Sequence, residues 1–436
     1  MMHALNGTRP VTRTASVLAA LLLLLSGALA AWPGQAHAAS SPADELSPAT
    51  WNMQYSRDNW NKAWELGGPH HVVALQELPQ ALPAEVQGQQ PRVQGNVERY
   101  TWQRGDRQRY LYVLRQPSRT LGMVTSFQSD VYFEITAPYR SMLAVVDMTR
   151  SMMFASAHAS AGRRAPYSPA GADAPALLRR AEDTARIAGI DWMVLGDFNR
   201  EPRQLLPDIP NGSRIYNSGR ATHRSGHEWD YGVSNVTTDR WRAGVGPNAA
   251  SDHWPVEFGT LRAAGEHGVA VHNVGNGEDL GVWGPGSRDG TPASTEPVSS
   301  NRDEDWVFQP SGVSQDGKKK TFRIVSMTSP PDKPKCLDVE NGPLGRPGDR
   351  YVLQDCRPLE HPPGLPDLGA SQNFSLTSPD PRLPNMHVLT NEATGFDASV
   401  LDRAPALGHW IGQGDKHPED ARKYYFYLNP VTAGPS

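Results

Sequence analysis

The segment Asp191–Arg200 constrains the fold of this chain more than any other. It contains four consecutive apolar residues, Trp192–Leu195, which predict a buried β-strand that ends at Gly196. A carboxylate and a carboxamide follow at once, at Asp197 and Asn199. Ligands of an open α/β sheet bind beyond the carboxyl ends of its strands, so we expect both side chains at the mouth of a cleft.

Other short apolar runs are also bordered by polar side chains. The bordering residues are Asn52 within the run 50–53, Glu77 after 72–75, His158 after 152–155, and Asp252 with His253 before 254–258. A single polar residue at a strand end is usually an ordinary loop residue. Their repetition along the chain predicts an acidic, histidine-bearing, metal-dependent active site.

The first 38 residues have the pattern of a secretory signal peptide. Arg9 and Arg13 precede an apolar run, Val17–Ala31, that is too short to span a bilayer. Ala36–Ala38 then provides a small-x-small cleavage site, so we predict that residues 1–38 are removed. A membrane anchor is the alternative interpretation of this segment.

The composition limits the remaining classes of function. Gly (40) and Pro (38) are abundant, which indicates a loop-rich and β-rich chain. The two cysteines, Cys336 and Cys356, are expected to form one disulfide in an exported chain, and they do not indicate a structural zinc site.

The formal net charge of −4 gives no general sign of nucleic-acid binding. The segment Arg92–Arg119 differs, because it holds seven arginines and two acids. It is either a solvated charged face or a strip that contacts phosphates.

A helix is expected between the strand that leads to His158 and the strand that leads to Asp197. Asp173 is placed to cap its first turn, Pro175 lies in that turn, and Gly189 ends it. The apolar stripe of this helix consists of Leu177, Leu178, Ala181, Ala185 and Ala188. A strand–helix–strand unit of this length predicts a crossover within an α/β sheet, in a first domain that spans residues 46–261.

The order of these motifs resembles a known enzyme superfamily. The matching segments are Thr50–Asn52, Gln76–Glu77, Ser126, Ala157–His158, Trp192–Arg200, Thr222–Gly226, Asp230–Tyr231 and Ser251–Val256. They resemble the endonuclease/exonuclease/phosphatase superfamily and, more narrowly, the nuclease (B) subunit of cytolethal distending toxins. The resemblance implies an α/β four-layer α/β/β/α sandwich (DNase-like) and a Mg²⁺-dependent DNase, with phosphoinositide dephosphorylation in some members.

The resemblance and the chemistry of phosphodiester hydrolysis together suggest a metal site. Glu77 is the expected ligand of Mg²⁺, with Mn²⁺ or Ca²⁺ as alternatives, because a hard cation prefers carboxylate oxygen. Asn52 and Asp252 would complete or support that shell. For Asn52 the alternative is that it only satisfies backbone groups.

Two histidines are expected to form the acid–base pair. A histidine pKa near 6.5 suits proton transfer at neutral pH, which favours His158 and His253 for this role. By resemblance, Asp230 would orient His158. Asp252 adjoins His253 in sequence, but neighbours on a strand point to opposite faces, so we expect it to act through the metal or another histidine. His223 either touches substrate or only caps a loop.

The remaining predicted site residues concern the phosphate group. Asp197 and Asn199 are expected to position the nucleophile and a phosphate oxygen. The resemblance implies that Arg109 contacts phosphate, and Arg140 is a second candidate for that contact.

The second predicted domain spans residues 268–432 and is expected to be all-β. Helical periodicity disappears there, and Gly, Pro, Asp and Asn separate short apolar runs. A weak threefold repeat begins at Leu280, Leu337 and Phe396, at separations of 57 and 59 residues.

This region resembles ricin-type β-trefoil lectins. In that family a disulfide closes a characteristic loop, which Cys336 and Cys356 would do here. If the domain binds a sugar, Asp338 and Asp397 are the expected carboxylates, since a sugar site needs an acceptor and a stacking aromatic ring. The alternative is a trefoil that serves only as a scaffold or a protein-docking surface.

The sequence therefore predicts a secreted, Mg²⁺-dependent phosphodiesterase, in the first place a DNA endonuclease. Its expected partners are DNA or another phosphoester, and cell-surface or extracellular glycans through the C-terminal domain. The first alternative is a phosphoinositide phosphatase or a sphingomyelinase-like phosphodiesterase on the same site. The second is a secreted lectin with an inert enzyme-like domain. Whether additional toxin subunits are needed stays open, because here the lectin-like part is fused to the nuclease-like part.

Overall fold

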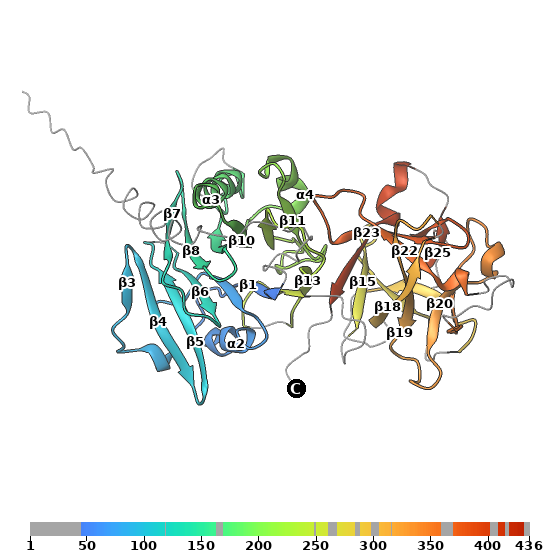
Figure 1. Ribbon diagram of the computed structural model, residues 1–436, viewed down its shortest axis with the longest axis horizontal. Coiled ribbons are helices and arrows are strands. Elements are labelled where there is room, and N and C mark those ends of the chain that lie inside the picture. Colours follow the sequence, from blue (N-terminus) through green and yellow to red (C-terminus); the bar gives the residue numbers. More distant parts are fainter. Residues whose placement is uncertain are drawn as a thin grey trace, which may run out of the picture.

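A computed structural model describes residues 45–430 except 118, 163–168, 248–249, 260–267, 284–287, 298–304, 315, 359–368, 402–408 and 415–417. The expected signal peptide, residues 1–38, and the residues between the two predicted domains, 262–267, lie outside the described residues. Among the described helices, none has the length and apolar character needed to cross a membrane. Figure 1 shows the strands of residues 48–259 on one side of the molecule and those of residues 269–430 on the other.

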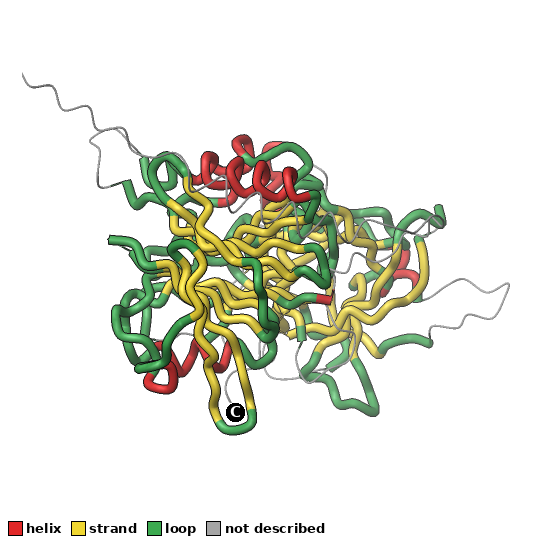
Figure 2. Tube along the Cα trace, turned by 60° about the vertical axis from the view of Figure 1, so that its left-hand side comes forward, coloured by secondary structure: helices red, strands yellow, loops and turns green. Residues whose placement is uncertain are grey.

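Two β-sheets pack face to face in the part up to residue 259 (Figures 1 and 2). The first sheet contains, in spatial order, β13 (Arg242–Val245), β14 (Val256–Gly259), β1 (Pro48–Asn52), β2 (Val72–Gln76), β6 (Leu121–Thr125), β5 (Arg107–Leu114), β4 (Val97–Arg104) and β3 (Arg92–Gln94). The second contains β11 (Arg214–Tyr216), β12 (Asp230–Ser234), β10 (Asp191–Asp197), β9 (Met152–His158), β8 (Ser141–Asp147) and β7 (Tyr132–Thr136). Buried side chains of both sheets, such as Met123 and Phe154, share one core.

Helices cover the outer faces of the two sheets. Helix α2 (Asn59–Leu66) buries Trp60 against Leu75 of the first sheet. Helix α3 (Ala174–Ala188) buries Leu178 against Val194 of the second. The layers therefore run α2, first sheet, second sheet and α3, in the predicted α/β/β/α order. The short helices in the connections are η2 (Ala84–Val86), α4 (Pro202–Leu205) and η3 (Leu206–Asp208).

Helix α3 is the predicted crossover, because it joins the parallel neighbours β9 and β10. It ends at Gly189, whose φ of 66° is left-handed and whose N–H bonds to the carbonyl of Ala185. Asp173 is the N-cap residue of α3, as predicted, but its side chain makes no capping hydrogen bond. Its Oδ1 instead accepts a hydrogen bond of 2.7 Å from the backbone N–H of Ser160, just after β9.

The arginine-rich segment forms the hairpin β4–β5 and its surroundings, and most of its charges are paired. The ion pairs are Arg92–Asp130 (2.9 Å), Arg99–Asp130 (3.1 Å), Arg104–Glu85 (2.6 Å) and Arg115–Glu98 (3.0 Å). This pattern fits a solvated charged face better than an open strip for phosphates.

The part from residue 269 contains only strands and short 3-10 helices among its described residues. The strands are β15 (Val269–Asn273), β16 (Asp279–Val282), β17 (Ala293–Glu296), β18 (Asp305–Val313), β19 (Lys320–Ser326), β20 (Lys335–Val339), β21 (Tyr351–Asp355), β22 (Phe374–Thr377), β23 (Met386–Asn391), β24 (Asp397–Val400), β25 (His409–Gly414) and β26 (Phe426–Pro430). The short helices are η5 (Gly342–Leu344), η6 (Ala370–Gln372) and η7 (Pro418–Tyr424).

These twelve strands repeat one pairing pattern three times. β15 pairs with β18, β19 with β22, and β23 with β26, while β18–β19, β22–β23 and β26–β15 pairs close the six strands into a ring. The strand pairs β16–β17, β20–β21 and β24–β25 complete the three units. The predicted repeat starts, Leu280, Leu337 and Phe396, lie on or directly before the first strand of each pair.

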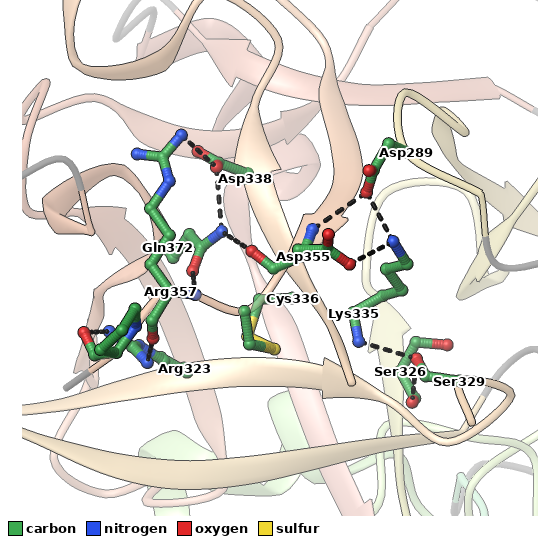
Figure 3. The surroundings of a disulfide bond; sticks show 12 residues. Asp289, Arg323, Ser326, Ser329, Lys335, Cys336, Asp338, Asp355, Arg357 and Gln372 are labelled. Carbon is green, nitrogen blue, oxygen red and sulfur yellow. Dashed lines mark hydrogen bonds and ion pairs between the residues drawn. A yellow bond between two sulfur atoms is a disulfide. The ribbon is translucent and has the colours of Figure 1, made fainter. Parts of the chain in front are cut away.

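The predicted disulfide joins Cys336 on β20 to Cys356, which directly follows β21 (Figure 3). Next to it, the Lys335 ammonium lies between the carboxylates of Asp289 and Asp355, at 2.6 and 2.5 Å. The disulfide and the Lys335–Asp355 pair join the two strands of the β20–β21 hairpin, and Asp289 links this hairpin to the connection between β16 and β17.

One hydrophobic core extends across both parts of the chain. Met386 on β23 and Tyr427 on β26 are buried in the same cluster as Ile215 and Tyr231 of the second sheet, and Phe198, which directly follows β10. The division into domains at residues 46–261 and 268–432 stays a prediction, but the two parts are packed together.

Gly196→Ala is expected to lower the free energy of unfolding by about 3 kcal/mol, because its Cβ would lie 1.9 Å from the carbonyl oxygen of Ala157 on the neighbouring strand β9. Gly189→Ala is the matched control. It also has a left-handed φ, but no atom lies within 4 Å of its Cβ, so we expect a loss of about 1 kcal/mol. Urea-induced unfolding measures both, and equal losses would contradict the close approach of β9 and β10.

Candidate active site

Strands from both sheets end at one place. Asn52 ends β1 beside the end of its parallel neighbour β2, which Glu77 follows. On the second sheet, β9 and β10 are also parallel, so their last residues, His158 and Asp197, lie opposite each other. β12 runs antiparallel to β10, and its first residue, Asp230, lies opposite Asp197 as well. The register of the strands therefore brings the predicted residues to one edge of the sandwich.

Asp197 lies at the centre of this cluster and is almost completely buried. Its Oδ2 accepts a hydrogen bond of 3.1 Å from Asn52 Nδ2, which links the two sheets. The same oxygen lies 3.3 Å from His158 Nε2 and 3.8 Å from His253 Nε2. Its Oδ1 accepts the backbone N–H of Asn199 at 2.8 Å. One carboxylate thus faces both candidate acid–base histidines.

Asp230 pairs with His253, which corrects the predicted pairing with His158. Asp230 Oδ2 lies 2.7 Å from His253 Nδ1, and Thr222 Oγ1 donates a hydrogen bond of 2.8 Å to the same oxygen. The cause is the backbone hydrogen bond from Trp254 to the carbonyl of Thr222, which brings His253 next to the start of β12. A carboxylate at Nδ1 fixes the ring and leaves Nε2 facing Asp197.

His158 contacts a different set of charged groups. Its Nε2 lies 3.8 Å from Glu77 Oε1 and in contact with the guanidinium of Arg119. Arg119 Nη1 is also 3.8 Å from Glu77 Oε1. Sequence reasoning did not single out Arg119. Arg119 lies before β6, outside any helix or strand. The only feature of the sequence that pointed to it was its position at the end of the arginine-rich segment Arg92–Arg119.

Two arginines were predicted to contact phosphate, and the structure separates them. Arg140 donates a hydrogen bond of 3.2 Å to the His158 carbonyl, so it lies beside the cluster. Arg109 bonds to the carbonyl of Gly67, and its guanidinium lies over the Trp64 ring. The next residue, Tyr110 on β5, pairs with Thr125 on β6, and Thr125 in turn pairs with Val72, the first residue of β2. Glu77 follows the last residue of β2. The prediction for Arg109 is corrected, because the antiparallel order β2–β6–β5 takes it to the opposite end of the sheet.

Asp252 faces His223, in line with the expectation that it acts through another histidine. Its Oδ2 lies 3.4 Å from His223 Nε2, and its Oδ1 lies 4.0 Å from His253 Nε2. The His223 ring stacks on Trp229 with centroids 4.4 Å apart. His223 Nδ1 also interacts with Ser225 Oγ at 2.6 Å, so the residue holds its own loop as well as bordering the cluster.

The two histidines differ in their electrostatic surroundings. Burial, together with the guanidinium groups of Arg119 and Arg140, holds the pKa of His158 well below its usual value. Burial also acts against the charged form of His253, but the carboxylates of Asp230 and Asp197 outweigh it and raise the pKa of His253 to about 9. Burial and the nearby charge of Asp230 raise the pKa of Asp197 to about 7. The cluster thus combines a neutral and a protonated histidine with a carboxylate that titrates near neutrality.

Two polar residues of the cluster have left-handed backbones. The φ angle is 50° for Glu77 and 49° for Asn199, values that are uncommon for residues other than glycine. Asn199 Nδ2 donates to the Ala159 carbonyl at 3.1 Å, which holds this conformation. Such conformations concentrate at functional sites, where surrounding contacts keep a side chain aimed in one direction.

The chemistry of Glu77 and the residues near it suits a divalent cation, although neither cluster with metal-ligand spacing among the described residues includes Glu77. Burial raises the pKa of the Glu77 carboxyl, so a bound cation would favour its charged form. Asn52 Oδ1 and the half-exposed carboxylate of Asp252 supply further hard oxygen atoms of the kind that Mg²⁺ prefers. Two clusters with metal-ligand spacing occur among the described residues: His223, Asp252 and His253, and Asp197, Asp230 and His253.

The two carboxylates predicted to bind sugar are both buried. Asp338 is 1% exposed, and its Oδ2 accepts a hydrogen bond of 3.0 Å from Gln372 Nε2 (Figure 3). Asp397 is 7% exposed and accepts a hydrogen bond of 2.7 Å from Thr390 Oγ1. They occupy equivalent places, because Asp338 lies on β20 and Asp397 on β24, the first strands of two of the repeated pairs.

The raised pKa of His253 predicts a pH dependence of stability. The pKa is about 9 in the folded chain and about 6.5 in an unfolded one. The resulting stabilisation is complete below pH 6.5 and is lost as the pH rises to 9. The free energy of unfolding of the wild type should therefore exceed that of Asp230→Asn at pH 6, and this gap should shrink by about 2 kcal/mol toward pH 9.5. Urea unfolding in EDTA measures it; a gap that does not change with pH would contradict the assigned pair.

No protein-family model and no curated protein matches this sequence. Several solved structures are similar to parts of this chain. The cytolethal distending toxin of Actinobacillus actinomycetemcomitans is 26% identical, with 50% of this chain and 99% of that chain covered and a TM-score of 0.43. The 3′-5′ exonuclease NExo of Neisseria meningitidis is 15% identical over 49% of this chain and 98% of that chain, with a TM-score of 0.35. ThreeFoil, a designed 3-fold symmetric protein, is 17% identical over 37% of this chain and 96% of that chain, with a TM-score of 0.28.

Proposed function

We propose that this protein is a secreted, divalent-metal-dependent phosphodiesterase that acts as a DNA endonuclease. The observation that carries the proposal is the pair of histidines on either side of Asp197. His158 Nε2 and His253 Nε2 lie 3.3 and 3.8 Å from the same Asp197 oxygen, with Glu77 3.8 Å from His158. Hydrolysis of a phosphodiester needs a base for the attacking water, an acid for the leaving oxygen and charge neutralisation, and this cluster offers all three.

The residues of the cluster have separate roles in a single displacement step at phosphorus. A cation held by Glu77 and Asn52 would neutralise charge on the phosphate. Asp197 takes a proton from the attacking water, for which a pKa of about 7 is suited. The new bond joins the water oxygen to phosphorus. His253, protonated and held by Asp230, gives its proton to the leaving oxygen as the old phosphorus–oxygen bond breaks.

His158 and two arginines support the same step. His158 lies 3.3 Å from the same Asp197 oxygen, and its lowered pKa suits the base side of the proposed acid–base pair. Arg119 and Arg140, which flank it, supply positive charge where the negative charge on the phosphate increases.

DNA as substrate rests on the resemblance of Thr222–Gly226 and Asp230–Tyr231 to the toxin nucleases. A phosphoinositide phosphatase is the second candidate, and one observation favours it. Arg119 and Arg140 lie beside His158, where a terminal phosphate would bind. Arg92, Arg99 and Arg104 on β3 and β4, in contrast, are paired with acids away from the cluster. A sphingomyelinase-like phosphodiesterase would use the same residues.

The C-terminal part is proposed to be a ricin-type β-trefoil that binds cell-surface or extracellular glycans. The closed ring of six strands with three strand pairs supports this fold. Asp338 and Asp397, in equivalent places, are the proposed sugar ligands. Removal of residues 1–38 on export belongs to the same proposal.

Nicking of supercoiled plasmid DNA tests the catalytic proposal. Wild type should nick in Mg²⁺ and not in EDTA, and His158→Ala or His253→Ala should reduce the rate at least about 100-fold, because each removes a group that moves or holds a proton. His409→Ala, on β25, is the matched control and should keep full activity.

Two further outcomes separate the alternatives. Phosphate release from phosphoinositides without nicking would assign the second candidate. Silence in both assays would leave a binding protein and refute the enzymatic proposal.

Arg119→Ala and Arg109→Ala form a second matched pair. Arg119→Ala should lower kcat by about 100-fold, because its guanidinium lies against His158 and near Glu77. Arg109→Ala should change kcat less than about twofold, because Arg109 bonds to Gly67 at the other end of the sheet. Steady-state kinetics on a labelled DNA duplex measure both, and an equal effect of the two changes would refute the assignment of Arg119.

A further inference from the structure

The loop of residues 217–229 lies between β11 and β12 and leads directly to Asp230. Its Thr222 Oγ1 donates to the Asp230 carboxylate at 2.8 Å and accepts the backbone N–H of Asp230 at 2.9 Å. The Thr222 carbonyl accepts the N–H of Trp254. This loop therefore sets the positions of Asp230 and of the segment that carries His253.

The base of the loop is closed by a buried carboxylate. Glu228 Oε1 accepts hydrogen bonds from Ser218 N, Ser218 Oγ and Gly219 N, at 2.6, 2.8 and 2.8 Å. Its Oε2 accepts one from Asn217 Nδ2 at 2.9 Å. Because Glu228 is two residues before Asp230, a shift of residues 217–219 is passed on to the candidate active site.

Residues of the C-terminal part hold this loop from outside. Arg220 forms an ion pair with Asp279, which is 1% exposed and lies on β16. Asp279 Oδ1 is also 2.8 Å from His272 Nδ1 on β15. Removing one partner of a buried ion pair leaves the other charge without compensation.

Tyr427 on β26 makes a second contact with the loop. Its hydroxyl accepts a hydrogen bond of 3.1 Å from Asn217 Nδ2. Its ring lies directly against Gly219, where an added Cβ would be 2.1 Å from Tyr427 Cδ2. Asn385 Nδ2 also donates to the Asn217 carbonyl at 3.2 Å, so the C-terminal part contacts the loop at Asn217, Gly219 and Arg220.

We propose that Asp279 and Tyr427 are positioning residues for the hydrolytic step: the C-terminal part orders the loop 217–229, and this loop aligns the Asp230–His253 pair. The inference rests on the proposed function, because it assigns these residues to catalysis at that site. The C-terminal part thereby supports turnover in addition to its proposed role in binding glycans.

The test uses the full chain with Asp279→Asn, Asp279→Glu, Tyr427→Phe and Arg220→Met. Tyr351→Phe is the matched control, since Tyr351 is also buried in the C-terminal part, and its hydroxyl has no hydrogen-bond partner among the described residues. The measurements are kcat and KM on a labelled DNA duplex, and hydrogen exchange of peptides that cover residues 217–229.

Asp279→Asn and Arg220→Met should lower kcat by about tenfold with KM within about twofold, because misalignment affects the transition state more than substrate binding. Both should speed exchange in residues 217–229. Tyr427→Phe should do the same to a smaller extent. Asp279→Glu keeps the charge and should retain more of kcat than Asp279→Asn. Tyr351→Phe should match wild type in both measurements.

The proposal would be overturned if Asp279→Asn and Arg220→Met left both hydrogen exchange and kcat unchanged. It would also be overturned if the control Tyr351→Phe lowered kcat as much as these two changes do. A wild type without turnover on DNA or phosphoinositides would refute the proposed function and the catalytic part of this inference. Exchange would then still decide whether the C-terminal part orders the loop, so the two failures are distinguishable.

Discussion

The parallel register of β9 and β10 is the constraint on which the rest of the site depends. It sets His158 opposite Asp197, and the antiparallel strand β12 adds Asp230 opposite the same residue. This register requires Gly196, because a side chain there would collide with the backbone of β9. The hydrogen bond from Asn52 to Asp197 then joins the first sheet to the second at the same point. The chemistry of the site follows from how closely four strand ends approach one another.

The sequence was sufficient for much of this arrangement, because short apolar runs followed by polar residues report strand ends directly. Asn52, Glu77, His158, Asp197 and Asn199 could be placed at one edge on that basis alone. The helix between His158 and Asp197 was also predictable, since its apolar stripe and terminal glycine are local signals. In the C-terminal part, the repeat starts matched strands because each unit uses similar residues at similar places.

The features that sequence reasoning missed depend on contacts between distant segments. The pairing of Asp230 with His253 follows from the backbone bond between Thr222 and Trp254, for which no residue pattern exists. Arg119 stands in an irregular segment, so no periodicity indicated its direction. The prediction for Arg109 was wrong because the strand order β2–β6–β5 decides which end of the sheet Arg109 occupies. The sequence of the β4–β5 hairpin does not show that order.

The contact between Tyr427 and the loop 217–229 has a consequence for biosynthesis. A ribosome makes His158, Asp197, Asp230 and His253 long before it reaches Tyr427. While residues up to 259 emerge, the groups for hydrolysis exist, but the strand that would order their loop does not. A nascent chain would then carry a complete set of chemical groups in an unaligned state. Under the proposed function, turnover would then begin only after the C-terminal part has been made and has packed against the loop.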